Sequence, residues 1–155
     1  VADAFHDFAL RAEDQGIKLA LEMHSGTLTA TPEGSVRLLE MADSPNLKLN
    51  YQPPVGESNV DSAIALVGPH VINVHAQNYR PSPVKPDTME LCLLEEGVLD
   101  YNRVLSLLES HGFKGFVEVE FLKGEHVSDQ MMLESLRRDA AYLRKLCARY
   151  TNTGN

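Results

Sequence analysis

Four short segments of the chain alternate apolar and polar residues with the two-residue period of a β-strand. These segments are Ile17–His24, Leu47–Gln52, Val71–Gln77 and Phe116–Phe121. In each segment one parity is apolar throughout, and we expect that face to pack in the core. The other parity is mainly polar and carries, near the C-terminal end of the segment, a group that can bind or react. These end groups are, in chain order, Glu22, Gln52, His75 and Glu120.

Helical patterns occupy the intervals around these strands. The spacing of apolar residues predicts amphipathic helices near residues 3–15, 31–41, 58–67, 99–111 and 128–149. Strands that alternate with helices favour a parallel sheet, because each helix carries the chain back to the start of the next strand. Residues 78–97 contain Pro81, Pro83 and Pro86, and we expect them to form a long connection.

The polar parity of the strands indicates which kind of parallel sheet this is. An open sheet covered by helices on both sides is apolar on both faces. Here the second face also carries Lys18, Lys48, Asn50, Asn73 and Glu118. So much polarity suits the interior of a (β/α)8 TIM barrel, where sites form at the C-terminal strand ends. Four strands do not close such a barrel, so we predict an α/β chain with only about four C-terminal βα units. These would occupy residues 1–150, followed by a disordered tail, 151–155.

Five pieces of the sequence carry a resemblance to a known family. They are Gly16–His24, Pro45–Gln52, His70–His75, Glu96–Tyr101 and His111–Glu120. In order and spacing these pieces resemble the xylose isomerase-like TIM barrels, which include sugar-phosphate isomerases, epimerases and related endonucleases. The resemblance runs through nearly the whole chain and implies that its strands are the fifth to eighth of the barrel. It is specific for the superfamily and not for one reaction.

The resemblance also implies a metal site. In the family a divalent metal is held by Glu, Asp, His and Glu, which by position are Glu22, Gln52, His75 and Glu120 here. Gln52 replaces the usual Asp, and Val55 replaces a histidine that commonly follows. The implied cofactor is Mn²⁺, Mg²⁺, Co²⁺ or Zn²⁺. With one carboxylate fewer we expect weaker binding, and a lost or repurposed metal site is the alternative.

The function implied by the resemblance is that of an isomerase or epimerase acting on a sugar, a sugar phosphate or a polyol. A metal-bound carbonyl would acidify the neighbouring C–H group, and Glu22 and Glu120 would be the catalytic residues that move the proton. One alternative is an inositol-type keto-polyol dehydratase that uses the same site. Another is a non-catalytic sugar-binding barrel with a degenerate metal site, which Gln52 and Val55 favour.

Two further residues are candidates for substrate binding. His24 lies two residues beyond Glu22 on the same parity, and Arg80 follows the third strand. A solvent-facing histidine and a surface arginine are the competing interpretations. For Glu118, one layer below Glu120, we expect an internal ion pair with one of the lysines on the same parity.

Composition narrows the choice of partners. The chain has 14 Lys and Arg against 22 Asp and Glu, a net charge of −8, which disfavours nucleic acid and therefore an endonuclease. The cysteines, Cys92 and Cys147, lack metal-like spacing, so we expect a reduced, cytoplasmic setting. No apolar run is long enough to span a membrane, and no signal peptide is visible. Half a barrel leaves sheet edges exposed, so we expect either a piece of a longer protein or a homo-oligomer.

Overall fold

The computed structural model describes residues 1–55, 59–120 and 128–151. Its elements are α1 (Ala2–Glu13), β1 (Leu19–Glu22), α2 (Pro32–Ala42), β2 (Leu47–Tyr51), α3 (Val60–Val67), the 3-10 turn η1 (Gly68–His70), β3 (Val71–Ala76), β4 (Asn78–Pro81), β5 (Met89–Cys92), α4 (Tyr101–Ser110), β6 (Phe116–Val119) and α5 (Asp129–Thr151). Within these ranges no helix has the length and apolar character needed to cross a membrane. The predicted tail lies outside the described residues, apart from Thr151, which ends α5.

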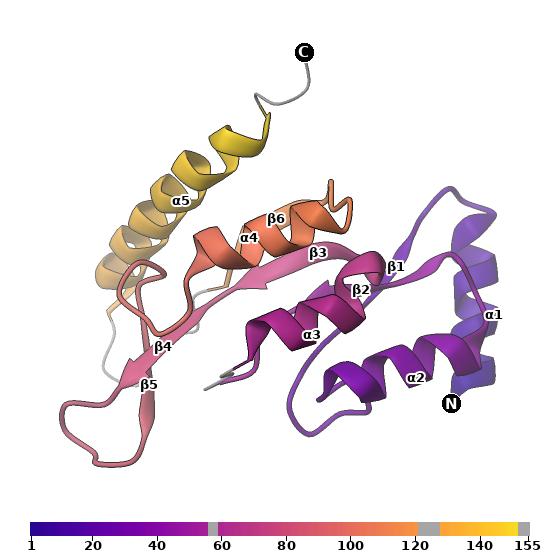
Figure 1. Ribbon diagram of the computed structural model, residues 1–155, viewed down its shortest axis with the longest axis horizontal. Coiled ribbons are helices and arrows are strands. Elements are labelled where there is room, and N and C mark those ends of the chain that lie inside the picture. The colour runs from indigo at the N-terminus through magenta and orange to yellow at the C-terminus, as the bar shows by residue number, and fades with distance from the viewer. Residues whose placement is uncertain (56–58, 121–127, 152–155) are drawn as a thin grey trace.

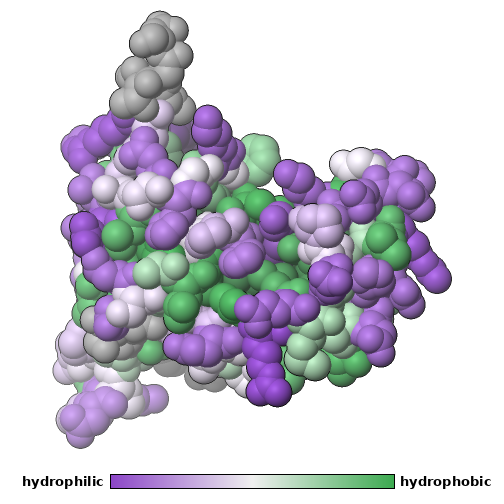
Figure 2. Space-filling view, turned by 45° about the vertical axis from the view of Figure 1, so that its right-hand side comes forward, coloured by the Kyte–Doolittle hydropathy of each residue, from purple (hydrophilic) through white to green (hydrophobic). Residues whose placement is uncertain are grey.

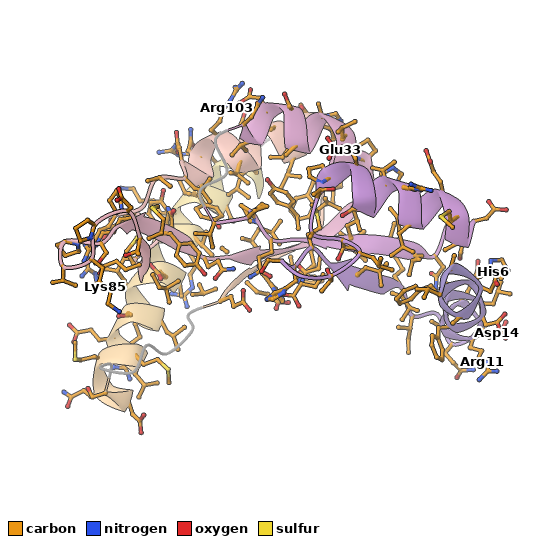
Figure 3. The ribbon with its side chains drawn as sticks, turned by 90° about the horizontal axis from the view of Figure 1, so that it is seen from below. His6, Arg11, Asp14, Glu33, Lys85 and Arg103 are labelled. Atoms are coloured by element: carbon orange, nitrogen blue, oxygen red, sulfur yellow. The ribbon has the colours of Figure 1, made fainter. Side chains whose placement is uncertain are left out.

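The main sheet is parallel and has the strand order β1-β2-β3-β6. Helices α2, α3 and α4 lie along one side of it, whereas α1 and α5 lie toward its two ends, and each helix packs against the next in the chain (Figure 1). Seen from below, the helices that carry Glu33 and Arg103 lie on the same side of the sheet (Figure 3). An α/β sheet with helices on one side and four parallel strands is the arrangement of an open half of a TIM barrel.

The apolar parity of the strands packs against these helices. The core combines strand residues with helix residues, among them Leu47, Leu49, Tyr51, Val74, Leu39, Ile64 and Leu108. Ile17, which the alternation places on the core face, lies before β1 and is 56% exposed. The alternation is also interrupted in β3. Leu49 pairs with Val71 but Asn50 pairs with Asn73, so β3 carries an irregularity of one residue against β2. Val71, which is 5% exposed, therefore joins the core, whereas Ile72 is only half-buried. Not all apolar groups are covered, because Figure 2 shows hydrophobic residues in the middle of one face between polar margins.

Helix ends follow the local sequence signals. Thr31 precedes α2, and its hydroxyl oxygen accepts a hydrogen bond of 3.0 Å from the Gly34 N–H, while Pro32 takes the first helical position. Asp100 caps α4 in the same way through the Asn102 N–H. Gly112, with φ of +80°, follows α4 in the left-handed conformation that glycine adopts without strain. These interactions explain why helix positions could be predicted from the sequence.

The segment 78–97 was predicted as a connection, and this was only partly right. It contains an antiparallel hairpin in which β4 pairs with β5, from Asn78 opposite Cys92 to Pro81 opposite Met89. The prolines concealed it, since proline cannot donate to a strand ladder. Pro81 ends β4 and the other two lie in the turn, where a missing N–H does no harm.

Asp139 ties α5 to the residues that follow this hairpin. Its side chain is buried, and Oδ1 accepts a hydrogen bond of 2.9 Å from the Leu94 N–H. Burial raises the pKa of Asp139 despite this bond, so keeping the carboxylate ionised opposes folding at neutral pH.

Replacing Asp139 with asparagine should therefore keep the acceptor and remove that penalty. Because the folded pKa lies above the unfolded one, the native protein loses stability as the pH rises through the folded pKa. We expect D139N to melt at a higher temperature than the native chain at pH 7, with the difference vanishing below the unfolded carboxyl pKa of about 3.9. Thermal unfolding across pH measures this, and a D139N protein that is less stable at neutral pH would contradict it.

Candidate metal centre

The parallel strands bring the four predicted end groups to one edge of the sheet. Glu22 is the last residue of β1, and His75 is the last but one of β3. Gln52 and Glu120 each follow their strand by one residue. The Glu120 N–H donates to the Ala76 carbonyl at 2.9 Å, which continues the pairing of β3 with β6 and holds Glu120 beside His75. Parallel register therefore gathers residues that lie far apart in sequence, from Glu22 to Glu120.

Three of these side chains form a compact cluster. Glu22, His75 and Glu120 each offer one ligand atom, and these atoms lie within 4.8 Å of one another. His75 Nδ1 is 3.6 Å from Glu22 Oε1 and 3.9 Å from Glu120 Oε2. The side chains of His75 and Glu120 are 23% and 24% exposed, against 39% for Glu22, so the cluster opens toward the Glu22 side.

Gln52 lies beside the cluster and is hydrogen-bonded to Glu120. Its Nε2 donates a hydrogen bond of 2.7 Å to Glu120 Oε2, and the residue is 5% exposed. Its other amide atom, Oε1, is buried and has no hydrogen-bond partner, and the same is true of His75 Nδ1. Buried polar atoms are rarely left without a partner in folded proteins. Two such atoms at one cluster indicate that something beyond the described residues completes it.

The chemistry of these groups fits a divalent cation. Two carboxylates, an imidazole nitrogen and an amide oxygen are all acceptors, and a cation would supply the partner that Nδ1 and Oε1 lack. One imidazole among oxygen ligands suits Mn²⁺, Co²⁺ or Zn²⁺, and also admits Mg²⁺. Glu22, Gln52, His75 and Glu120 are therefore the residues that could hold a metal. Their assignment as ligands stays a prediction.

The two predicted substrate contacts have different surroundings. His24 is exposed just beyond β1, and its Nδ1 lies 2.8 Å from the Ser25 carbonyl oxygen. Arg80 lies on the β4–β5 hairpin, where its guanidinium pairs with Glu90 at 3.0 Å and Glu96 at 3.1 Å. These pairs already engage Arg80. A substrate role for either residue stays a prediction.

A cavity beside the cluster contains His24 in its wall. It measures about 270 Å³, and its lining includes Met23, His24, Gln52, Pro53, Gln77 and Tyr79. Because Gln52 lines this cavity and is hydrogen-bonded to Glu120 of the cluster, a molecule in the cavity would lie next to the candidate metal ligands. Among the described residues, its polar lining consists of hydroxyl, amide and imidazole groups and includes no lysine or arginine.

Tyr79 lines the cavity beside the candidate metal centre and was not predicted from the sequence. Its hydroxyl donates to Gln77 Oε1 at 2.7 Å. Burial, together with the nearby Glu120 carboxylate, raises the pKa of Tyr79, so the phenol keeps its proton. Tyr79 lies on the unpredicted hairpin, and only that hairpin turns it toward the cluster. In the sequence, the one feature that pointed to Tyr79 was its position just after a strand that ends in polar residues.

Asn78 holds the end of β3 in place. It is completely buried, and its Nδ2 donates to the carbonyls of Leu94 and Leu99 at 2.8 and 2.9 Å. Its Oδ1 accepts from the N–H groups of Tyr79 and Leu99 at 2.9 and 3.1 Å. A Cβ at Gly97 would lie 2.1 Å from this side chain, so only glycine fits there. The Glu96–Tyr101 piece of the sequence thus closes around Asn78.

Tyr101 fixes the neighbouring residue. Its hydroxyl donates to the Gln77 carbonyl at 2.7 Å and accepts from the Gln77 N–H at 3.0 Å. Tyr101 is fully buried beneath the sheet. Together with Asn78 it satisfies the hydrogen-bonding groups of the backbone between β3 and the hairpin, and this holds His75, the cluster residue on β3, in place.

Several solved structures share this architecture. None of the curated proteins matches the chain. Among solved structures, a xylose isomerase-like TIM barrel protein from Mycobacterium smegmatis in complex with magnesium has 20% identity and a TM-score of 0.76 over 94% of this chain and 48% of its own. The probable 3-DHS dehydratase AsbF from Bacillus anthracis has 21% identity and a TM-score of 0.65, over 86% and 53%. A D-allulose 3-epimerase from Methylomonas sp. has 15% identity and a TM-score of 0.73, over 94% and 54%.

These likenesses show the fold, and the chain spans about half the length of the structures it matches. The family model for the xylose isomerase-like TIM barrel matches residues 1–146. That range includes all strands of the parallel sheet and every residue of the candidate metal centre. The chain belongs to the xylose isomerase-like TIM barrel family.

Proposed function

We propose that this chain carries the metal-binding half of an isomerase or epimerase that acts on a sugar or a related polyol. The observation that carries the proposal is the cluster of Glu22, His75 and Glu120, with Gln52 at its side. Its buried Nδ1 and Oε1 atoms have no hydrogen-bond partner, as expected of metal ligands. A neighbour of the same fold was solved with magnesium.

In this proposal the two glutamates move protons on opposite faces of a bound substrate. Glu22 ends β1 and Glu120 follows β6, which are the two outer strands of the sheet. A metal bound between them would polarise a substrate carbonyl and make the adjacent C–H group acidic. One carboxylate would take that proton, and the other would return a proton to the opposite face of the same carbon. The net result is inversion at one carbon.

The cavity beside the cluster supports a neutral, hydroxyl-bearing substrate. Gln77 and Tyr79 line it with an amide and a phenol, and His24 contributes an imidazole. These groups exchange hydrogen bonds with hydroxyls, whereas a phosphate would favour an arginine or lysine. Arg80, the nearest candidate by sequence, pairs with Glu90 and Glu96. Free ketohexoses are therefore the first substrates to test, starting with D-allulose, after which one structural neighbour is named.

Metal titration tests the centre directly. We expect native mass spectrometry to show one Mn²⁺ bound per chain. Replacing Gln52 with aspartate should strengthen Mn²⁺ binding by about tenfold or more, because it adds a negative charge where the amide oxygen stands. Replacing Gln52 with leucine should weaken binding, since it removes that oxygen.

The pair of Gln52 variants also separates the alternatives. Equal Mn²⁺ affinity in the native, Q52D and Q52L proteins would show that position 52 does not contact the metal. Absence of bound metal in the native protein, with binding restored in Q52D, would identify a degenerate site.

Metal binding by Q52D but not by the native protein would favour a second function, that of a sugar-binding barrel without turnover. The observation behind it is the 2.7 Å bond from Gln52 Nε2 to Glu120 Oε2, in which an amide donor occupies an oxygen that a metal would otherwise use. Sugar binding in the presence of a chelator, without conversion, would support it. A dehydratase would share the first proton abstraction, and product analysis separates it from an epimerase.

Quaternary structure is part of the proposal. β1 and β6 are the outer strands of the sheet and leave backbone groups unpaired in the described residues. In a complete barrel these edges would pair with further parallel strands. The mass spectrum that counts metals also counts chains, and a dimer would fit pairing of two copies through these edges.

A further inference from the structure

Glu118 lies beside His75 on the polar face of the sheet. The two residues are Cα partners in the parallel ladder of β3 and β6, so their side chains project next to each other. Glu118 Oε2 is 3.7 Å from His75 Nε2. The predicted ion pair of Glu118 with Lys18 or Lys48 is not found among the described residues. Glu118 therefore faces the imidazole instead of a lysine.

The two ring nitrogens of His75 thus face different carboxylates. Nδ1 points toward Glu22 and Glu120, at 3.6 and 3.9 Å, and Nε2 points toward Glu118. A neutral imidazole carries one proton, and the hydrogen bond made by one nitrogen decides whether the other is free to bind a metal. If the proton were on Nδ1, it would point into the cluster and block ligation there.

We infer that Glu118 is a positioning residue that holds the proton of His75 on Nε2 and directs the lone pair of Nδ1 into the metal centre. The 3.7 Å separation is longer than the roughly 2.9 Å of a hydrogen bond, so Glu118 acts on the proton of Nε2 as the nearest facing carboxylate, at ion-pair distance. Glu118 touches neither the metal nor the substrate in this assignment. The inference rests on the proposed metal centre for its purpose, but the position of the proton can be measured without metal.

The variants are chosen to separate a hydrogen-bond acceptor from a mere negative charge. Glu118→Leu removes both the charge and the acceptor, and Glu118→Gln removes the charge but keeps an acceptor oxygen. Glu109→Gln, at an exposed position on α4, removes one charge far from the cluster and is the matched control. The Glu118 side chain is 59% exposed, so none of these changes disturbs the core.

The first measurement is nitrogen NMR of ¹⁵N-histidine-labelled, metal-free protein near pH 8, where an ordinary imidazole is neutral. We expect E118L to shift the proton of His75 toward Nδ1, where Glu22 and Glu120 accept it, relative to the native and E109Q proteins. The second measurement is Mn²⁺ titration. Loss of a partner behind a histidine ligand typically weakens metal binding about 10- to 100-fold, and we expect this for E118L. E118Q should bind Mn²⁺ nearly as well as E109Q.

Two results would overturn the inference. One is an unchanged tautomer ratio in E118L, and the other is equal weakening of Mn²⁺ binding in E118Q and E118L, which a general charge effect would produce. A native chain that binds no Mn²⁺ would instead defeat the proposed function. The tautomer measurement would still decide the role of Glu118 in that case, so the two failures are distinguishable.

Discussion

Replacing Glu120 with glutamine is expected to abolish the exchange of solvent deuterium into a ketohexose substrate. Glutamine has the same shape, and its amide oxygen can still accept the bond from Gln52 Nε2, so the fold should be kept. What disappears is the group that takes or returns a proton. Loss of a general acid or base lowers rates by about 10²- to 10⁴-fold. The measurement is mass spectrometry of the sugar after incubation in D₂O with saturating Mn²⁺.

Controls separate chemistry from metal loss in this experiment. The E109Q protein removes an equal charge at an exposed helix position and should retain exchange. Native mass spectrometry under the same conditions shows whether E120Q still holds its metal. If a metal-loaded E120Q protein exchanged deuterium at the native rate, Glu120 would have no part in proton transfer.

Replacing Asn78 with leucine is expected to cause the largest loss of stability of any change considered. The asparagine makes four hydrogen bonds to backbone groups around it, all of them from a fully buried position. Each buried partner left unsatisfied opposes folding by about 1–3 kcal/mol. We therefore expect a loss of at least about 3–5 kcal/mol, a large share of the stability of a small domain. Urea-induced unfolding measures the loss.

Two further variants test the explanation. Asn78→Asp keeps the oxygen that accepts from the Tyr79 and Leu99 N–H groups but turns an oxygen toward two carbonyls, so it should be intermediate or similarly unstable. Asn102→Ala removes an asparagine on α4 whose Oδ1 accepts only an exposed bond from Arg149. That control should change stability little. If N78L were as stable as N102A, Asn78 would not organise the end of β3.

Glu120 could be predicted as a functional residue from the sequence, whereas the role of Asn78 could not. Glu120 was found because a strand pattern ended in a charged residue, and the parallel register then placed it next to His75. Asn78 was not found, because a buried asparagine with four partners looks like any polar residue after a strand. Two of its partners, Leu94 and Leu99, lie 16 and 21 residues further along the chain, beyond the reach of local patterns.

The sequence by itself determined the elements and the class of fold. Period-two alternation predicted four strands and the spacing of apolar residues predicted the helices between them, because both patterns depend on neighbours within a few residues. The cap at Asp100 was not predicted, and α4 begins two residues later than expected. The polar parity of those strands indicated a barrel interior and supplied Glu22, Gln52, His75 and Glu120. The family match over residues 1–146 agrees with that prediction.

Only the tertiary structure decided how these side chains face one another. It places Glu118 against His75 and not against a lysine, because strand register, and not charge alone, chooses the neighbour. It turns the amide nitrogen of Gln52 toward Glu120 and leaves its oxygen buried without a partner. It also folds the proline-containing segment into a hairpin that brings Tyr79 to the site. These contacts join residues far apart in the chain, and their geometry follows from the packing of the whole sheet.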